Sequence, residues 1–96
     1  MDNNIKPYAN LENEDLHCQN LKDADLRRAN LKNADLQFAD LSGASLLLAD
    51  LRCANLTGAN LTGANLRAAD LRHANLTNAN LTGSNIHLAD TEDAIF

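Results

Sequence analysis

The chain has 96 residues, a formal net charge of −5 at pH 7, and a hydrophobic fraction of 45% that comes almost entirely from Leu and Ala. This length suits one small domain, and the moderate negative charge argues against ordinary binding to nucleic-acid phosphates. No apolar run approaches the roughly 18 residues of a membrane span, and Cys18 and Cys53 are too few for a disulfide framework. We therefore expect one cytosolic domain with reduced cysteines.

The first eight residues, Met1–Tyr8, precede the repetitive part of the sequence. They lack the positively charged and apolar regions of a secretory signal peptide, which agrees with a cytosolic location. Ile5, Pro7 and Tyr8 give this stretch apolar surface. We expect it to fold over one end of the following domain as an N-terminal cap.

From Ala9 to about Asp90 the sequence repeats every five residues. Leu recurs at every fifth position from Leu11 through Leu81, fifteen times without a break, and Ile86 keeps the phase. Of the eighteen such positions up to residue 96, fifteen have Ala two residues before them, and sixteen have Asp or Asn one residue before. A repeat this regular predicts a repetitive architecture.

A period of five fits neither regular secondary structure. On an α-helix, five residues rotate each Leu by about 140° from the last, so the Leu side chains would spread around the whole circumference. On a continuous strand, an odd period would send successive Leu to opposite faces. Within a short extended segment, however, Ala and the Leu two residues later share a face. The pattern therefore predicts short extended steps separated by corners, with Ala and Leu inward and successive turns about 4.8 Å apart.

This repeat resembles that of the pentapeptide-repeat proteins, in which a small residue, Asp or Asn, Leu, Ser/Thr/Arg and a variable residue follow one another. The segments Ala54–Gly58, Ala59–Gly63 and Ala79–Gly83 all read Ala-Asn-Leu-Thr-Gly. The resemblance implies an all-β fold, a right-handed quadrilateral β-helix with four five-residue sides per turn and about four turns. Residues twenty apart would then stack. The columns of inward Leu would be 11/31/51/71, 16/36/56/76, 21/41/61/81 and 26/46/66, with Ile86 ending the last.

Two departures mark the start of the repeat. Glu14 and Gln19 occupy inward positions that elsewhere hold Ala. A buried carboxylate there would be unfavourable unless it were neutralised or paired. We therefore expect a distorted first turn, with regular turns beginning near Ala24.

The repeat also ends irregularly. Thr91 and Ile95 break the pattern, and Phe96 restores an apolar residue. We expect residues 91–96 to form a C-terminal cap in which Ile95 and Phe96 are the bulky plug. An uncovered turn would leave unpaired strand edges and invite end-to-end association.

One outer column would hold Asn13, Asn33, Cys53, His73 and Asp93. A thiolate, an imidazole and a carboxylate are what a cysteine nucleophile needs, and the same groups can bind a metal. The column would lie on a convex exterior without a cleft or evident oxyanion donors. We expect solvated side chains here, with no catalytic residue, metal site or cofactor, and we interpret the other histidines and Cys18 in the same way.

Charges of both signs fall on the predicted outer faces. Six Lys or Arg directly follow a Leu: Lys22, Arg27, Lys32, Arg52, Arg67 and Arg72. Side chains two residues apart share a face, so we expect neutralising pairs Asp25/Arg27, Asp50/Arg52 and Asp70/Arg72. Some pentapeptide-repeat proteins bind type II topoisomerases as mimics of duplex DNA, which needs an uninterrupted negative surface. Inhibition of gyrase by DNA mimicry is therefore the alternative function and not the favoured one.

Large apolar side chains fall on a few outward positions: Phe38, Leu47, Leu48 and Leu88. Exposed apolar clusters often mark contacts, although scattered surface Leu are common. With Ile95 and Phe96 they are the predicted protein-contact residues. We expect a rigid, non-enzymatic rod that binds a protein partner or a second copy of itself, through a rod end or the Leu47/Leu48 side, without direct contact to nucleic acid or membrane.

Overall fold

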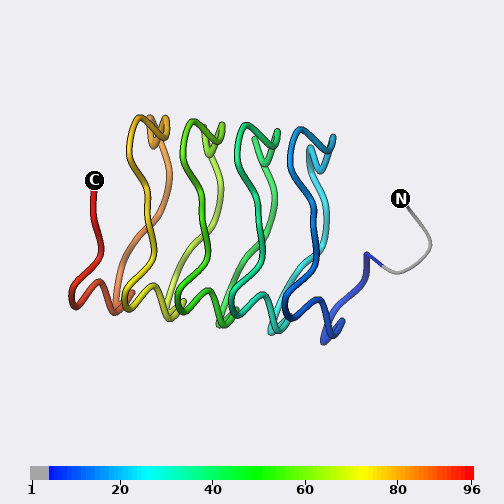
Figure 1. Ribbon diagram of the computed structural model, residues 1–96. Helices are drawn as coiled ribbons and strands as arrows, with labels where there is room; N and C mark the ends of the chain where they lie inside the picture. The colour runs from blue at the N-terminus through cyan, green and yellow to red at the C-terminus, as the bar shows by residue number, and fades with distance from the viewer. Residues whose placement is uncertain (1–4) are drawn as a thin grey trace.

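The computed structural model describes residues 5–96, which wind around one axis (Figure 1). These residues contain no helix and no extended strand; each side of the coil contributes a single residue to parallel β-bridges. Every bridge joins residues twenty apart, from Asn10↔Asn30 to Asn75↔Ile95. The fold is therefore a β-solenoid, and its twenty-residue turn holds four of the five-residue steps. The coil measures 31 × 20 × 19 Å, an elongated body with a nearly square cross-section.

The corners explain the polar positions of the repeat. The fifth residue of each step has a left-handed φ, from 57° at Ala68 to 71° at Gly83. Ahead of each corner, the Asp or Asn side chain accepts a hydrogen bond from the backbone two residues later, as Asp50 Oδ1 does from the N–H of Arg52 at 3.1 Å. The carbonyl of Leu51 then accepts the N–H of Ala54 at 3.0 Å and closes the corner. Asp and Asn recur because they stabilise this turn.

Backbone hydrogen bonds join each turn to the next. The N–H of Leu51 donates to the carbonyl of Asp70 at 2.8 Å, and the N–H of Cys53 donates to Arg72 at 3.0 Å. In the opposite direction, the N–H of Asp50 donates to the carbonyl of Ala29 at 2.9 Å. The pattern repeats around the coil, so the backbone groups of interior turns have hydrogen-bond partners in the turns on both sides.

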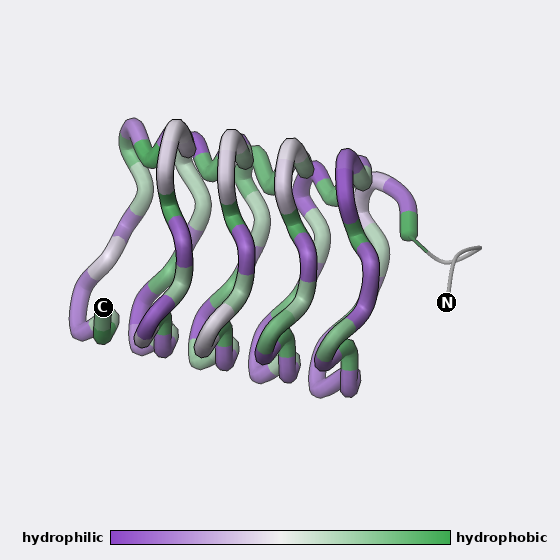
Figure 2. Tube along the Cα trace, turned by 90° about the horizontal axis from the view of Figure 1, so that it is seen from above, coloured by the Kyte–Doolittle hydropathy of each residue, from purple (hydrophilic) through white to green (hydrophobic). Residues whose placement is uncertain are grey.

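The core consists of stacked Leu and Ala. Every Leu slot from Leu11 through Leu76 is 0–3% exposed, and Ala29 through Ala74 line the same interior. The predicted columns of inward Leu are confirmed over this range. Figure 2 shows hydrophobic and hydrophilic stretches recurring at the same places in successive turns. No buried polar or charged residue occurs among residues 5–96.

The expectation of a distorted first turn is wrong. The bridges begin at Asn10, and the left-handed corners begin at Tyr8 and Asn13, so the backbone is regular from the start of the repeat. Glu14 is exposed and Gln19 half-buried, because no complete turn lies over them. Their polar groups reach solvent without disturbing the coil.

The predicted N-terminal cap is described only in part. Ile5 is half-buried and packs against the core, and the N–H of Tyr8 donates to the carbonyl of Arg27 at 2.9 Å. Residues 1–4 lie outside the described residues. The division into a cap at residues 1–8, a repeat at 9–90 and a cap at 91–96 stays a prediction.

Residues 5–96 also include no helix long and apolar enough to cross a membrane.

Candidate protein-interaction surface

The last turn leaves a group of large apolar side chains uncovered. Ile86, Leu88, Ile95 and Phe96 are 48–66% exposed, and Leu81 is half-buried. The equivalent Leu61, Leu66 and Leu76 one turn earlier are at most 1% exposed, because a further turn lies over them. We call Leu81, Ile86, Leu88, Ile95 and Phe96 the apolar end.

Residues 91–96 continue the coil. Ile95 forms a bridge with Asn75, and its carbonyl accepts the N–H of Leu76 at 2.6 Å. Phe96 therefore stands in the next Leu slot, over the side occupied by Leu76. With Phe96 62% exposed and Ile86 48% exposed, the last turn itself remains open to solvent. The sequence singled out Ile95 and Phe96 but not Ile86, whose exposure follows from its being in the final turn.

Leu47 and Leu48 lie at one corner, away from the apolar end. Leu47 is half-buried and Leu48 is 41% exposed. Twenty and forty residues later, the column of Leu48 continues with Ala68 and Leu88. Ala68 separates the two Leu, so this corner presents a small apolar strip that reaches the apolar end at Leu88.

Phe38 occupies a different corner. It is 63% exposed, and its ring lies over Gly58, the next residue in its column. A Cβ added at Gly58 would lie 2.5 Å from Phe38 Cε1, so only glycine leaves room for the ring in this position. The corner of Phe38 falls two sides before that of Leu48 along the chain. The structure therefore does not unite the six predicted contact residues into one patch.

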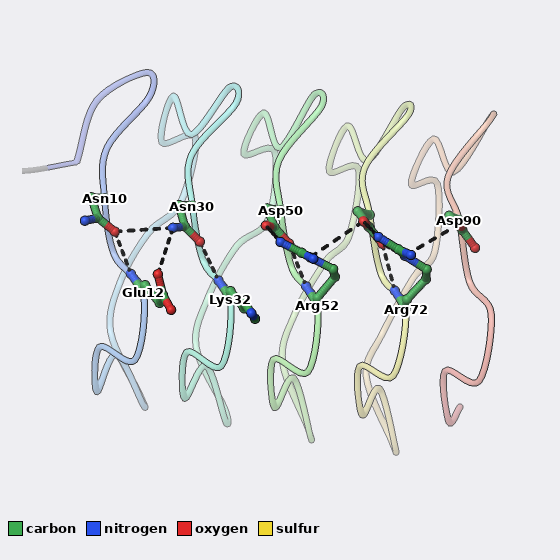
Figure 3. A network of polar contacts seen from close by, with 9 residues as sticks. Asn10, Glu12, Asn30, Lys32, Asp50, Arg52, Arg72 and Asp90 are labelled. Carbon is green, nitrogen blue, oxygen red and sulfur yellow. Dashed lines mark hydrogen bonds and ion pairs between the residues drawn. The ribbon is translucent and has the colours of Figure 1, made fainter.

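One outer face carries a ladder of charges (Figure 3). Arg52 donates from Nε and Nη2 to the carboxylate of Asp50 at 2.9 and 2.7 Å, and Arg72 binds Asp70 in the same way at 2.9 and 2.7 Å. Between turns, Arg52 Nε lies 3.8 Å from Asp70 Oδ2, and Arg72 Nε lies 3.8 Å from Asp90 Oδ2. All three predicted pairs are confirmed, including Asp25/Arg27 on another face at 2.6 Å.

The arginines of the ladder lower the pKa of Asp50 and Asp70. The hydrogen bonds from the Arg52 side chain are the main cause of the lowered pKa of Asp50, and those from Arg72 play the same part for Asp70; partial burial opposes both shifts. A lowered folded-state pKa means that the stabilisation is present above the ordinary value of 3.8 and is lost as pH falls through the lowered pKa. Since such pairs contribute about 0–1 kcal/mol each, their main effect is to reduce the negative potential of this face.

The Cys53, His73 and Asp93 column does not gather into a reactive centre. His73 Nε2 lies 3.8 Å from Asp93 Oδ2, while Cys53 is an exposed, free thiol one turn away. Cys18 is also exposed and free. No pocket is found among residues 5–96.

A second polar cluster was not predicted from the sequence. His17 Nδ1 lies 2.6 Å from Asp15 Oδ1, and the possible ligand atoms of Asp15, His17 and Asp35 all lie within 4.8 Å of one another. The hydrogen bond with Asp15 is the main cause of the raised pKa of His17 and the lowered pKa of Asp15. Spacing gave a signal for this pair, since positions 15 and 17 share a face just as 25 and 27 do. The side chains of Asp15 and His17 are well exposed, which is ordinary for a surface ion pair.

Comparison with known proteins identifies the repeat. A family model described as pentapeptide repeats matches residues 9–47 and 49–87 in eight copies. No curated protein is significantly similar to the chain.

Several solved structures share the fold. HetL, a pentapeptide repeat protein involved in heterocyst differentiation regulation from the cyanobacterium Nostoc sp. strain PCC 7120, is 36% identical with a TM-score of 0.90; the match covers 93% of this chain and 43% of HetL. A pentapeptide repeat protein from the Arabidopsis thaliana thylakoid lumen is 35% identical with a TM-score of 0.85, covering 88% and 59% of the two chains. Rfr23, from the cyanobacterium Cyanothece 51142, is 36% identical with a TM-score of 0.70, covering 92% and 64%. The chain thus spans less than two thirds of each of these proteins.

Proposed function

Because the chain belongs to the pentapeptide-repeat family, we propose that it is a non-catalytic module that presents the apolar end of a rigid rod to a protein partner. The observation that carries this proposal is the contrast between equivalent positions in consecutive turns. Leu66 is fully buried and Ile86 is 48% exposed, although both stand in the same column. Within residues 5–96, the inward residues Leu81, Ile86 and Phe96 therefore have no turn over them, while Leu88 and Ile95 stand at outward positions beside them. Exposed apolar surface of this kind favours a protein contact.

We also propose a right-handed quadrilateral β-helix of about four turns, a cytosolic location, and no cofactor. Three of the eight Lys and Arg side chains, Arg27, Arg52 and Arg72, form an ion pair with a neighbouring Asp, two of them in the ladder of Figure 3. The apolar end is the most distinctive surface beside them. The Leu47/Leu48 side is the second candidate contact.

A capture experiment tests the proposal. Tagged protein is incubated with host lysate beside two variants, Ile86→Ser/Phe96→Ser and Leu47→Ser/Leu48→Ser, each verified as folded by circular dichroism. We expect specific partners to be retained by the wild type and the Leu47/Leu48 variant and lost from the Ile86/Phe96 variant. Equal retention by all three would exclude the apolar end as the contact. Loss of the partners only from the Leu47/Leu48 variant would show that the Leu47/Leu48 side is the contact.

The alternative function is inhibition of gyrase by DNA mimicry, which the net charge of −5 favours. Against it, Arg27, Arg52 and Arg72 each form an ion pair with a neighbouring Asp and interrupt the negative surface. We therefore expect micromolar protein to leave DNA supercoiling by gyrase unchanged. Inhibition that weakens as salt is added would establish an electrostatic mimic instead.

A further inference from the structure

We propose that one side of the rod binds acidic protein segments that carry apolar side chains. The contact is a patch that we call the basic corner, which consists of Arg28, Leu47, Leu48, Arg67 and Ala68. This inference rests on the proposed function in one respect, that the partner is a protein. It adds a surface distinct from the apolar end and the chemistry by which that surface recognises its partner.

Charge is distributed unevenly among the four sides of the rod. Over residues 9–96, three sides each hold more Asp and Glu than Lys and Arg, eleven against four in total. The fourth side holds three Arg and a single Asp, although the whole chain has a net charge of −5. This side consists of the steps 24–28, 44–48, 64–68 and 84–88. An otherwise negative rod therefore has one positive side.

Two of the three Arg on this side have no carboxylate partner within residues 5–96. Arg27 is bound by Asp25 at 2.6 Å, which makes a locally neutral pair. Arg28 and Arg67 are exposed and form no ion pair in the described part of the chain. The guanidinium carbon of Arg28 lies 5.9 Å from the centre of the Tyr8 ring, which favours its staying at this corner. Both guanidinium groups can therefore bind a carboxylate of another molecule through two parallel hydrogen bonds.

The adjoining side does not cancel this charge. It begins with Asp50 and Asp70, and these carboxylates are already bound by Arg52 and Arg72, each at 2.7 Å. Such pairs are close to neutral at a distance. The positive charge of the basic corner is therefore open to a partner.

The same corner presents apolar surface between the two Arg. Leu48 is 41% exposed, and Leu47 and Ala68 are half-buried. The N–H of Arg28 donates to the carbonyl of Leu47 at 2.8 Å, and the N–H of Leu48 donates to the carbonyl of Arg67 at 3.0 Å. These bonds place the patch on three successive turns, about 4.8 Å apart. Each of its residues 47, 48, 67 and 68 has a described turn on both sides, so their exposure does not depend on the ends of the rod.

An acidic segment with apolar side chains satisfies both parts of the patch. Its carboxylates can pair with Arg28 and Arg67, while an apolar side chain packs on Leu48 in the space left by the short side chain of Ala68. An extended anion such as duplex nucleic acid or a lipid surface would also approach the adjoining sides, whose carboxylates repel it. A single segment fits on one side, which is at most 20 Å wide and 31 Å long.

The small area predicts weak binding. A side of 20 × 31 Å offers roughly 600 Å², less than a standard stable interface buries per partner. We therefore expect a dissociation constant on the order of 100 µM. A contact this weak is lost in the washes of a capture experiment, so it has to be measured at equilibrium.

NMR titration of the isotope-labelled 96-residue chain with synthetic peptides tests the proposal. The first peptide repeats Glu-Ser-Leu-Ser over about twelve residues, because an extended backbone then places Glu and Leu on one face and spans the rod. The second peptide has Lys in place of Glu, and the third has Ser in place of Leu. We expect the first peptide to shift the amide signals of Leu47, Leu48, Arg67 and Ala68, and the other two to bind roughly tenfold more weakly. Added salt should weaken binding, because it screens the charges.

Charge variants separate the patch from the overall charge of the chain. Arg28→Glu/Arg67→Glu should weaken binding of the first peptide by roughly tenfold or more. The matched control is Lys22→Glu/Lys32→Glu, which changes the net charge by the same amount on two other sides of the rod. We expect the control to bind within about twofold of the wild type. Circular dichroism verifies that both variants are folded.

A second pair of variants separates the patch from the apolar end. Leu47→Ser/Leu48→Ser should also weaken binding of the first peptide, because the apolar part of the patch is lost. Ile86→Ser/Phe96→Ser should bind this peptide as the wild type does.

Each opposite result overturns the proposal. Amide signals that stay unchanged up to about 1 mM peptide exclude the contact. Equal losses in the Arg28/Arg67 and Lys22/Lys32 variants show a dependence on net charge alone. Phosphatidylserine vesicles or duplex DNA that shift the same amides more strongly than the peptide replace the protein partner by a lipid or a nucleic acid. If the peptide does not bind while the Ile86/Phe96 variant loses its partners in the capture experiment, this inference fails and the proposed function stands.

Discussion

Replacing Leu61 by Ala is expected to lower the free energy of unfolding by about 2–5 kcal/mol. Leu61 is fully buried in the middle of a column between Leu41 and Leu81. The truncation removes buried methyl groups and leaves a cavity that the stacked turns cannot easily close, because their spacing is set by backbone hydrogen bonds. Small domains have total stabilities of about 5–15 kcal/mol, so this one change removes a large share.

The matched control is Leu81→Ala, the same substitution one turn later. Leu81 is only half-buried, so both the lost burial and the cavity are smaller, and we expect a clearly smaller decrease. Urea denaturation followed by circular dichroism, with equal slopes for the variants, measures both changes. Equal destabilisation by the two substitutions would contradict the difference in burial between Leu61 and Leu81.

The inward positions could be predicted because the repeat itself encodes them. A residue that recurs every five positions, with Ala two before it, has one inward solution, and the burial of Leu11 through Leu76 confirms it. The number of sides per turn, in contrast, could not be predicted from the repeat alone. A five-residue step is compatible with several side counts, and the twenty-residue register came from the family resemblance before the bridges confirmed it.

The ends could not be predicted from residue type. Whether an inward residue is buried depends on the turns before and after it, so Ile86 is exposed while Leu66 in the same column is buried. The same reason misled the expectation for Glu14, since an inward position in the first turn still faces solvent. The grouping of the outward apolar residues could not be predicted either. Phe38 and Leu48 occupy the same position of the five-residue step, but the twenty-residue turn places them at different corners.

Replacing Ala59 by Leu is expected to lower the free energy of unfolding by about 1–3 kcal/mol. Ala59 is 1% exposed, and its column holds Ala39 and Ala79 at the same place in the neighbouring turns. The interior has no room for three more carbon atoms, because the N–H of Asn60 donates to the carbonyl of Ala39 at 2.9 Å and that of Asn80 to Ala59 at 3.0 Å, which fixes the distance between turns. The larger side chain must therefore adopt a strained conformation or break these bonds.

Ala79→Leu is the matched control for overpacking. Ala79 lies in the last turn and is half-buried, so an added Leu side chain there can extend toward solvent beside Leu81 and Phe96. We expect Ala79→Leu to change the unfolding free energy much less than Ala59→Leu does, and to enlarge the apolar end. Thermal unfolding of the two variants in parallel provides the comparison. If Ala59→Leu unfolds like the wild type, the interior is looser than a stack of Ala and Leu held by hydrogen bonds between turns allows.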